Sequence, residues 1–299
     1  MRAVSLTAGI AVLVCLALGA SKGSASLIEE ECGIAKHPSR IRRIVGGMDA
    51  KRFANPWMVL IMGERNMYGG GSLITSRFVL TSASCLTLEP KKVSLGEYDR
   101  NCTSEDCLSG RLVIDIEDEF IHPDYNMGRV SKNDIALLRL ATNVAFSEYI
   151  RPICLRTDHQ VGRKVQQLTA TGWGRTQSSE SSNILQTVLL TKIDLKHCNT
   201  RFHKELDASQ LCAGGNYKDT CNGDSGGPLS ARIPYRINGT KSKGSRRTFL
   251  LGIVSYGSSF CNGLGVYTNV NHFVKWIEET IRLSNIKSIQ KGQNKTVSR

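Results

Sequence analysis

A serine set among glycines is the feature of the sequence best suited to chemistry. The string Gly223-Asp224-Ser225-Gly226-Gly227-Pro228 permits a tight turn that exposes the Ser225 hydroxyl. The same turn can aim the backbone N–H groups of Gly223 and Ser225 at one point, where two donors stabilise a developing oxyanion. The pattern therefore predicts a nucleophile, Ser225, beside an oxyanion hole. Because most glycine-rich turns are only turns, the rest of the chain must decide between these readings.

The elements that would position this turn are mostly short strands. Short apolar runs broken by Gly, Asn, Asp and Ser predict strands at 57–62, 78–81, 134–140, 185–193, 249–255 and 265–270. Many short strands with turn signals are typical of a sandwich or barrel. One helix is expected, at the end, where Phe273, Val274, Ile277 and Ile281 recur at helical spacing after Asn271 as N-cap.

The two ends of the chain differ in composition from its body. Residues 1–20, or alternatively 1–25, have a positive start, an uncharged apolar run and then small residues, which predicts a secretory signal peptide. The apolar run is too short to span a bilayer. We expect a short propeptide at 21–43 containing Cys32, a main domain at 44–283 and a basic tail at 284–299. The protein is therefore expected to be secreted and extracellular, with no membrane span.

The charge balance and the cysteine count add two expectations. The formal net charge is +13, and the segments 232–247 and 282–299 hold basic residues and no acidic ones. Such segments are solvated surface or attract an anionic partner, such as a sulfated glycan. Nucleic acid is not an expected partner, since no recognition motif is present. Of ten cysteines, Cys15 lies in the signal, so an odd number remains and one thiol should stay unpaired.

Five further motifs, taken with the Ser225 string, resemble the chymotrypsin- and trypsin-like serine proteases. In chain order they are Ile44-Val-Gly-Gly47, Gly70-Gly-Ser-Leu-Ile74, Asp134-Ile-Ala-Leu-Leu138, Thr171-Gly-Trp-Gly174 and Gly265-Val-Tyr-Thr268. The resemblance implies an all-β fold of two packed six-stranded antiparallel barrels, with a C-terminal helix and a cleft between the barrels. It implies neither a cofactor nor a metal ion.

The same resemblance assigns roles to residues of this chain. It implies a zymogen cut after Arg43, whose new amino terminus at Ile44 pairs with Asp224. It makes Asp134 the acidic member of a catalytic triad with Ser225. It also places Asp219 at the base of a primary specificity pocket walled by Gly257 and Gly265, which would select Arg or Lys.

One position departs from the family where the chemistry is most sensitive. The family carries Thr-Ala-Ala-His-Cys, whereas this chain reads Thr81-Ser-Ala-Ser-Cys85, so Ser84 stands at the position of the catalytic histidine. A serine hydroxyl cannot act as a general base near neutral pH, and without a base Ser225 stays a poor nucleophile. None of the six histidines lies in the lost residue's local context; they are His37, His122, His159, His197, His203 and His272.

A second departure concerns the disulfides. The resemblance implies the pairs Cys32–Cys154, Cys102–Cys107, Cys198–Cys212 and Cys221–Cys261, the second as in some arthropod clip-domain proteases. Gly69 occupies the position of the cysteine that would pair with Cys85, so Cys85 is expected to be unpaired, either as a buried thiol or in an intermolecular bond.

Two kinds of surface signal remain. Asn101, Asn238 and Asn294 begin glycosylation sequons. Glu97, Glu105 and Asp106 lie in a loop that binds calcium in trypsin, but here we expect solvated side chains.

These observations favour a secreted trypsin-like homologue that is catalytically inactive and acts as a binding or regulatory module in an extracellular proteolytic cascade, of the arthropod immune type. Its partners would be extracellular proteins: a substrate-like ligand, an inhibitor or an activating protease. Two alternatives stay open. One is an active serine endopeptidase that cleaves after Arg or Lys with a rescued base. The other is an anionic glycan-binding protein that uses the basic loop and tail.

Overall fold

The computed structural model describes most of the chain downstream of residue 27. The described ranges are 28–36, 47–63, 67–87, 89–105, 109–126, 131–155, 164–176, 179–215, 219–235, 246–258, 261 and 263–297, without the side chains of 67, 68 and 291–297. The signal peptide, Arg43, Ile44, Cys107 and Asn238 are sequence-based predictions that lie outside these ranges, as does the side chain of Asn294.

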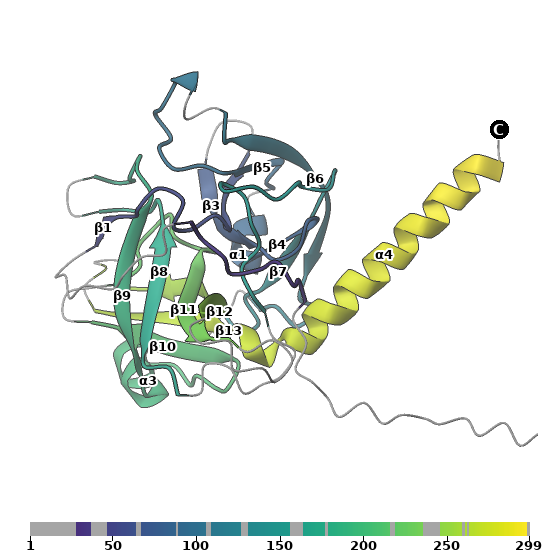
Figure 1. Cartoon of the computed structure of the whole chain (residues 1–299). Helices are drawn as coiled ribbons and strands as arrows, with labels where there is room; N and C mark the ends of the chain where they lie inside the picture. Colours follow the sequence, from purple (N-terminus) through teal and green to yellow (C-terminus); the bar gives the residue numbers. More distant parts are fainter. Residues whose placement is uncertain are drawn as a thin grey trace, which may run out of the picture.

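The first half of the described chain forms a closed six-stranded antiparallel barrel (Figure 1). Its strands are β2 (Met58–Met62), β3 (Met67–Leu73), β4 (Phe78–Thr81), β5 (Lys92–Leu95), β6 (Leu112–Ile121) and β7 (Ala136–Leu140). They pair in the order β2-β3-β4-β7-β6-β5, and pairing of β2 with β5 closes the ring. Every residue of β4 and β7 is buried, which is why both read as apolar runs apart from Thr81 and Arg139.

The second half forms another six-stranded ring. Its strands are β8 (Gln167–Gly172), β9 (Gln186–Ile193), β10 (Gln210–Gly214), β11 (Pro228–Pro234), β12 (Arg246–Gly257) and β13 (Leu264–Asn269). They pair in the order β9-β10-β13-β12-β11-β8, and β8 pairs with β9 to close the ring. The two-residue strand β1 (Met48–Asp49) adds to the edge of β9. The two-barrel, all-β fold is therefore confirmed.

Glycines on β3 let the two barrels meet at the nucleophile turn. A Cβ atom at Gly70 would lie 3.1 Å from the Cα of Gly227, and the Gly70 amide donates to the Ser225 carbonyl over 2.8 Å. A side chain at position 70 would crowd that turn, and a Cβ at Gly69 would lie 2.5 Å from the Ser225 carbonyl oxygen, so Gly69 and Gly70 are explained by close backbone approach. The contact fixes the turn of one barrel against a strand of the other.

The expected strands are all present, with shifted ends. The run at 249–255 lies within the longer β12, which begins at Arg246, and the run at 134–140 begins as a strand only at Ala136. The helix expected at the end of the chain is present. Two short helices are present, α1 (Ala83–Leu86) and α3 (Leu195–Phe202), and both carry residues that matter for the site.

The C-terminal helix also differs from expectation. A 3₁₀ turn, η1 (Val270–His272), contains Asn271, so that residue is not the N-cap, and α4 runs from Val274 to Val297. Phe273, Val274 and Ile277 are buried as expected. The helix continues through the segment expected to be a basic tail and projects from the barrels (Figure 1). No helix among the described residues is long and apolar enough to cross a bilayer.

A buried arginine explains why the helix continues past residue 283. Arg139 of β7 is 4% exposed; its Nη1 donates to the Ser284 hydroxyl over 2.8 Å and its Nη2 to the Ser288 hydroxyl over 2.9 Å. Its Nε donates to Glu117 of β6 over 2.8 Å. Because a buried guanidinium needs its donors satisfied, these helix side chains and the first barrel stabilise each other.

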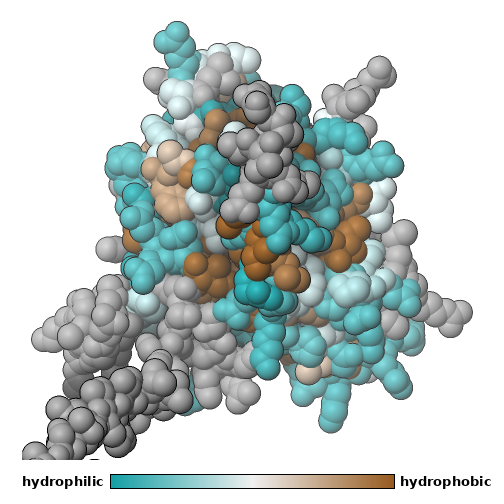
Figure 2. All heavy atoms as spheres, turned by 90° about the vertical axis from the view of Figure 1, so that its right-hand side faces the viewer, coloured by the Kyte–Doolittle hydropathy of each residue, from teal (hydrophilic) through white to brown (hydrophobic). Residues whose placement is uncertain are grey.

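The opposite side of this helix segment is less covered. Leu283, Ile286 and Ile289 are exposed. Figure 2, which faces the side of the molecule that carries α4, shows hydrophobic side chains in separate patches among hydrophilic ones.

Replacing this arginine should release the helix extension. For Arg139→Met we expect a loss of about 2–3 kcal/mol of stability, since Glu117 loses one of its two arginines and the helix hydroxyls lose a charged donor. Chemical denaturation would give the stability, and hydrogen exchange should show faster exchange across residues 284–290. Arg77→Met is the matched control, because Arg77 also binds Glu117, over 2.8 Å, but makes no contact with α4. Equal effects of the two changes would contradict the role of Arg139 in holding the helix.

Candidate active site

Ser84 and Asp134 meet where two paired strands end. Thr81, the last residue of β4, pairs with Ala136, the first of β7, so α1 just after β4 lies beside the segment just before β7. The Ser84 amide donates to Asp134 Oδ1 over 2.8 Å, and the Ser84 hydroxyl donates to Asp134 Oδ2 over 3.2 Å. The serine therefore binds the carboxylate that would orient an imidazole in a catalytic triad.

The Asp134 carboxylate is buried and fully occupied by the protein itself. Besides Ser84, the Ser255 hydroxyl donates to Oδ2 over 2.5 Å, and Thr268 donates to the backbone carbonyl of Asp134 over 2.7 Å. Burial raises the pKa of this carboxyl, and the hydrogen bonds from Ser255 and Ser84 oppose that rise. No local sequence pattern indicates that Ser255 and Thr268 bind Asp134, although Ser255 lies only two residues before Gly257 of the predicted pocket.

The turn around Ser225 has the shape of an anion-binding site. Gly223 has φ 91° and Gly226 has φ 79°, which glycine adopts without strain. A Cβ at Gly226 would also lie 2.2 Å from the Thr81 hydroxyl oxygen, so the turn packs closely on the first barrel. Within the described part of the chain, the amides of Gly223 and Ser225 donate no hydrogen bond. They are free to donate to an incoming oxyanion or carbonyl.

The Ser225 hydroxyl makes no hydrogen bond to any group in the described part of the chain. His122 stacks near Trp276 and Phe273, at ring-centroid distances of 5.1 and 5.2 Å, and accepts the Asp124 amide at Nδ1. His197, His203 and His272 make no hydrogen bond to Ser225 or Asp134 either. His37 and His159 lie outside the described residues.

Cys85 is a free, buried thiol beneath the nucleophile turn. Its Sγ donates to the Ser225 carbonyl over 3.3 Å and accepts from the Ser82 hydroxyl over 3.1 Å. Burial raises the thiol pKa to about 11, so the group stays protonated and cannot act as a base or nucleophile at neutral pH. A Cβ at Gly69 would lie 2.7 Å from this sulfur, which places position 69 where a disulfide partner would stand.

Three disulfides join pairs of described cysteines. They join Cys32 to Cys154, Cys198 to Cys212 and Cys221 to Cys261, which are three of the four pairings implied by the resemblance. Cys102 is also disulfide-bonded, while Cys107, its expected partner, lies outside the described residues.

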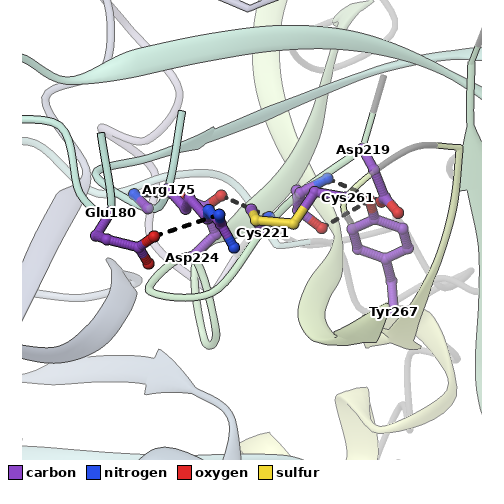
Figure 3. The surroundings of a disulfide bond; sticks show 9 residues. Arg175, Glu180, Asp219, Cys221, Asp224, Cys261 and Tyr267 are labelled. Atoms are coloured by element: carbon purple, nitrogen blue, oxygen red, sulfur yellow. Dashed lines mark hydrogen bonds and ion pairs between the residues drawn. A yellow bond between two sulfur atoms is a disulfide. The ribbon is translucent and has the colours of Figure 1, made fainter. Parts of the chain in front are cut away.

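The Cys221–Cys261 disulfide lies between two carboxyl groups, Asp224 on one side and Asp219 on the other (Figure 3). Asp224 accepts the amide of Gly174 over 2.8 Å and the amide of Cys221 over 2.9 Å. A Cβ at Gly172 would lie 2.1 Å from its Oδ1, so a glycine is needed to admit the carboxyl. Burial raises its pKa to about 6, and the two amides oppose the rise. Its pairing with Ile44 stays a prediction.

Asp219 has one oxygen satisfied and one unpaired. Oδ1 accepts the Thr220 amide over 2.8 Å, while Oδ2 is buried with no hydrogen-bond partner. A Cβ at Gly265 would lie 2.6 Å from Oδ1 and one at Gly257 would lie 3.3 Å from Oδ2, so a side chain at either position would crowd the carboxyl. Burial raises the pKa of Asp219 to about 7, and the hydrogen bond from the Thr220 amide opposes the rise. A carboxyl with one unpaired oxygen beside two glycines is suited to a cationic side chain.

The prediction of a solvated side chain was wrong for Glu97. Glu97 is 8% exposed and its carboxylate binds Arg111, with 2.8 Å from Oε2 to Nε. Because the Arg111 guanidinium neutralises this carboxylate, Glu97 is not available to balance the charge of a calcium ion. No group of three metal-ligating side chains occurs among the described residues. Asn101 of the first sequon is exposed, at a position open to glycosylation.

Comparison with known proteins assigns the family. A family model described as trypsin matches residues 44–277, and the chain therefore belongs to the trypsin family of serine proteases. Its relatives include insect CLIP-domain proteases. CLIP domain-containing serine protease B4 of Anopheles gambiae is 36% identical over 90% of this chain and 78% of its own length. Melanization protease 1 of Drosophila melanogaster is 37% identical over 80% of this chain and 66% of its own length.

A solved structure agrees with the fold. The crystal structure of the Drosophila Grass clip serine protease superposes with a TM-score of 0.71 at 30% identity, covering 84% of this chain and 74% of that one. This chain spans about two thirds to four fifths of the length of these relatives.

Proposed function

We propose that this chain is a catalytically silent member of the trypsin family, which binds a substrate-like segment with an Arg or Lys side chain and does not cut it. The binding would regulate an extracellular proteolytic cascade. The observation that carries the proposal is the Ser84 hydroxyl bound to Asp134 Oδ2, at the position where a triad has its imidazole.

The loss of a base is decisive because the rest of the machinery depends on it. In a comparable serine protease, removing the histidine alone costs about a millionfold in turnover. The oxyanion donors alone leave a residual acceleration of roughly a thousandfold over water. The Cys85 thiol, with its pKa near 11, supplies no substitute base. We therefore assign Ser225 to positioning a bound carbonyl rather than attacking it.

The binding half of the site is retained. The free amides of Gly223 and Ser225 can donate to a ligand carbonyl, and Asp219 Oδ2 lies unpaired beside Gly257 and Gly265. A basic side chain that reached Asp219 would gain a charge-assisted hydrogen bond and satisfy the buried oxygen. Such a site can hold a segment that a related protease would cleave.

Relatives suggest the biological setting. Several carry names that place them in processing or activation steps, such as Phenoloxidase-activating factor 1 of Holotrichia diomphalia and Spaetzle-processing enzyme of Drosophila melanogaster, at 34% and 35% identity. We propose that this chain is secreted alongside such proteases and competes for, or presents, their targets. The anionic glycan alternative rests on the basic segments 232–247 and 282–299, and residues 236–245 of the first segment lie outside the described ranges.

The proposal separates binding from catalysis in one experiment. The protein, intact or cut after Arg43, is mixed with a fluorescent benzamidinium as an arginine mimic, and with an arginine ester or a fluorophosphonate. We expect the benzamidinium to bind the cut form, while ester hydrolysis and labelling of Ser225 stay at background because no base removes the serine proton. A trypsin-family enzyme with an intact triad, assayed alongside, verifies the reagents.

Either half of the experiment can overturn the proposal. Rapid fluorophosphonate labelling, abolished by Ser225→Ala, would mean that the chain is an active enzyme. Failure of both forms to bind benzamidinium would mean that the Asp219 pocket is closed and that the binding function is wrong.

A further inference from the structure

Strand β12 has an unpaired edge beside the nucleophile turn. Its pairing with β11 ends at Ile253, opposite Pro228, whereas its pairing with β13 continues to Gly257, opposite Gly265. The amide of Gly226 donates to the Val254 carbonyl over 2.9 Å, so the turn of Ser225 adjoins the point where this edge begins. Among the described strands, none covers Ser255–Gly257 on this side. An extended peptide can bind to such an edge by main-chain pairing.

A lysine stands over the aromatic ring in the middle of this edge. The Lys204 ammonium lies 4.0 Å from the centroid of the Tyr256 ring, and Phe202 contacts the same ring edge-on, with centroids 5.8 Å apart. Tyr256 directly precedes Gly257, which faces Asp219. The Lys204 ammonium therefore lies over the residue that directly precedes Gly257, which borders the proposed Asp219 pocket.

The position of this lysine is fixed by its local structure. Helix α3 ends at Phe202, and His203 at φ 52° turns the chain so that the Lys204 amide donates back to the Asn199 carbonyl over 3.2 Å. The Asn199 side chain accepts the Leu206 amide over 3.1 Å, which holds the segment on both sides of Lys204. The Cys198–Cys212 disulfide anchors the helix to β10. The backbone that carries Lys204 is thus pre-organised.

The charge of this lysine is not neutralised within the described part of the chain. Lys204 is half-buried and forms no ion pair there, and its ammonium contacts only the face of the aromatic ring. Burial lowers its pKa, with no nearby acid to raise it again. A cation–π contact leaves ammonium N–H groups free to donate to a carboxylate.

We propose that Lys204 and Tyr256 form a subsite that selects an acidic side chain in the bound segment, upstream of its Arg or Lys. The inference rests on the proposed function, since it needs a peptide held along β12 with its basic side chain toward Asp219. The preferred ligand is then an extended segment with an Asp or Glu within the few residues before the basic residue. Lys204 is a specificity-determining residue that touches the ligand.

The test is a positional scan with labelled peptides. Peptides ending in arginine amide carry Glu, Gln or Lys at each of the three preceding positions, and anisotropy measures their binding to the full chain cut after Arg43. We expect Glu to bind about threefold to tenfold more tightly than Gln at one position, with Lys weakest, the range for a partly screened charge-assisted hydrogen bond. The preference should shrink in 0.5 M salt.

Two variants identify the residue responsible. Lys204→Glu should reverse the order of the Glu and Lys peptides, and Lys204→Arg should keep it. Lys196→Glu is the matched control, because Lys196 is an exposed lysine of α3, the helix that precedes Lys204, and undergoes the same charge reversal. Melting temperatures of all variants show whether each is folded.

The outcomes distinguish the acidic subsite from the proposed binding of an Arg or Lys side chain. If every arginine peptide binds but Glu and Gln are equal at all three positions, the subsite is wrong and the binding function stands. If the preference survives in Lys204→Glu, another residue creates it and the assignment is wrong. If no arginine peptide binds while the protein is folded, both fail together.

Discussion

Under the proposed function, Ser84→His is expected to convert a silent protein into a measurable hydrolase. An imidazole at position 84 would replace the serine hydroxyl on Asp134 Oδ2 and supply the base that Ser225 lacks. Because the loss of this residue costs about a millionfold in a comparable enzyme, we expect a gain of at least about a hundredfold, even with imperfect geometry. The rates of arginine-ester hydrolysis and of fluorophosphonate labelling, after cutting at Arg43, measure the gain.

The control is the double variant Ser84→His with Ser225→Ala, which should return to background. If Ser84→His labels no faster than the unchanged protein while its melting temperature is normal, then the cleft itself is misshapen and the missing imidazole is not the reason for inactivity.

Gly69→Cys, which would give Cys85 a disulfide partner, would also disturb the site tested by Ser84→His. A Cβ at Gly69 would lie 2.7 Å from Cys85 Sγ but also 2.5 Å from the Ser225 carbonyl oxygen. That carbonyl accepts both the Gly70 amide and the Cys85 thiol. Gly69→Cys would therefore move the nucleophile turn, and the single change at Ser84 is the cleaner test.

Asp219→Asn should abolish selective binding of cationic ligands, and binding by the unchanged protein should depend on pH. The Asp219 pKa is raised to about 7 by burial, so near neutral pH about half of the empty sites are protonated. A cationic ligand binds the ionised form and lowers this pKa in the complex. Affinity for benzamidinium should thus rise with pH, by up to about tenfold per unit below pH 7, and become constant above about pH 8.

Titration with the fluorescent benzamidinium between pH 5 and 8.5 checks this prediction. Asp219→Asn should bind at least about a hundredfold more weakly, with a flat pH profile, since the buried charge partner is gone. Asp118→Asn, which removes an exposed acid from β6, should leave both affinity and profile unchanged. A flat profile in the unchanged protein would mean that the carboxyl is already ionised in the empty pocket.

The sequence alone indicated an all-β structure and the identity of the residue at position 84. Strand-length apolar runs predicted a sandwich or barrel, because that pattern depends on local backbone geometry and on which residues are apolar. The arrangement as two barrels was implied by the resemblance that the ordered motifs and the Ser225 turn carry. The substitution at Ser84 is also visible without a structure, since the identity of one side chain decides whether a proton acceptor exists.

Only the tertiary structure decided which hydrogen-bond and ion-pair partners surround these residues. Ser84 and Ser255 bind Asp134, Arg111 neutralises Glu97, and Arg139 holds the end of α4, all between residues distant in sequence. The placement of Lys204 over Tyr256 likewise joins a helix end to a strand edge. Such pairings depend on burial and on partners supplied by other strands, and no local pattern encodes them.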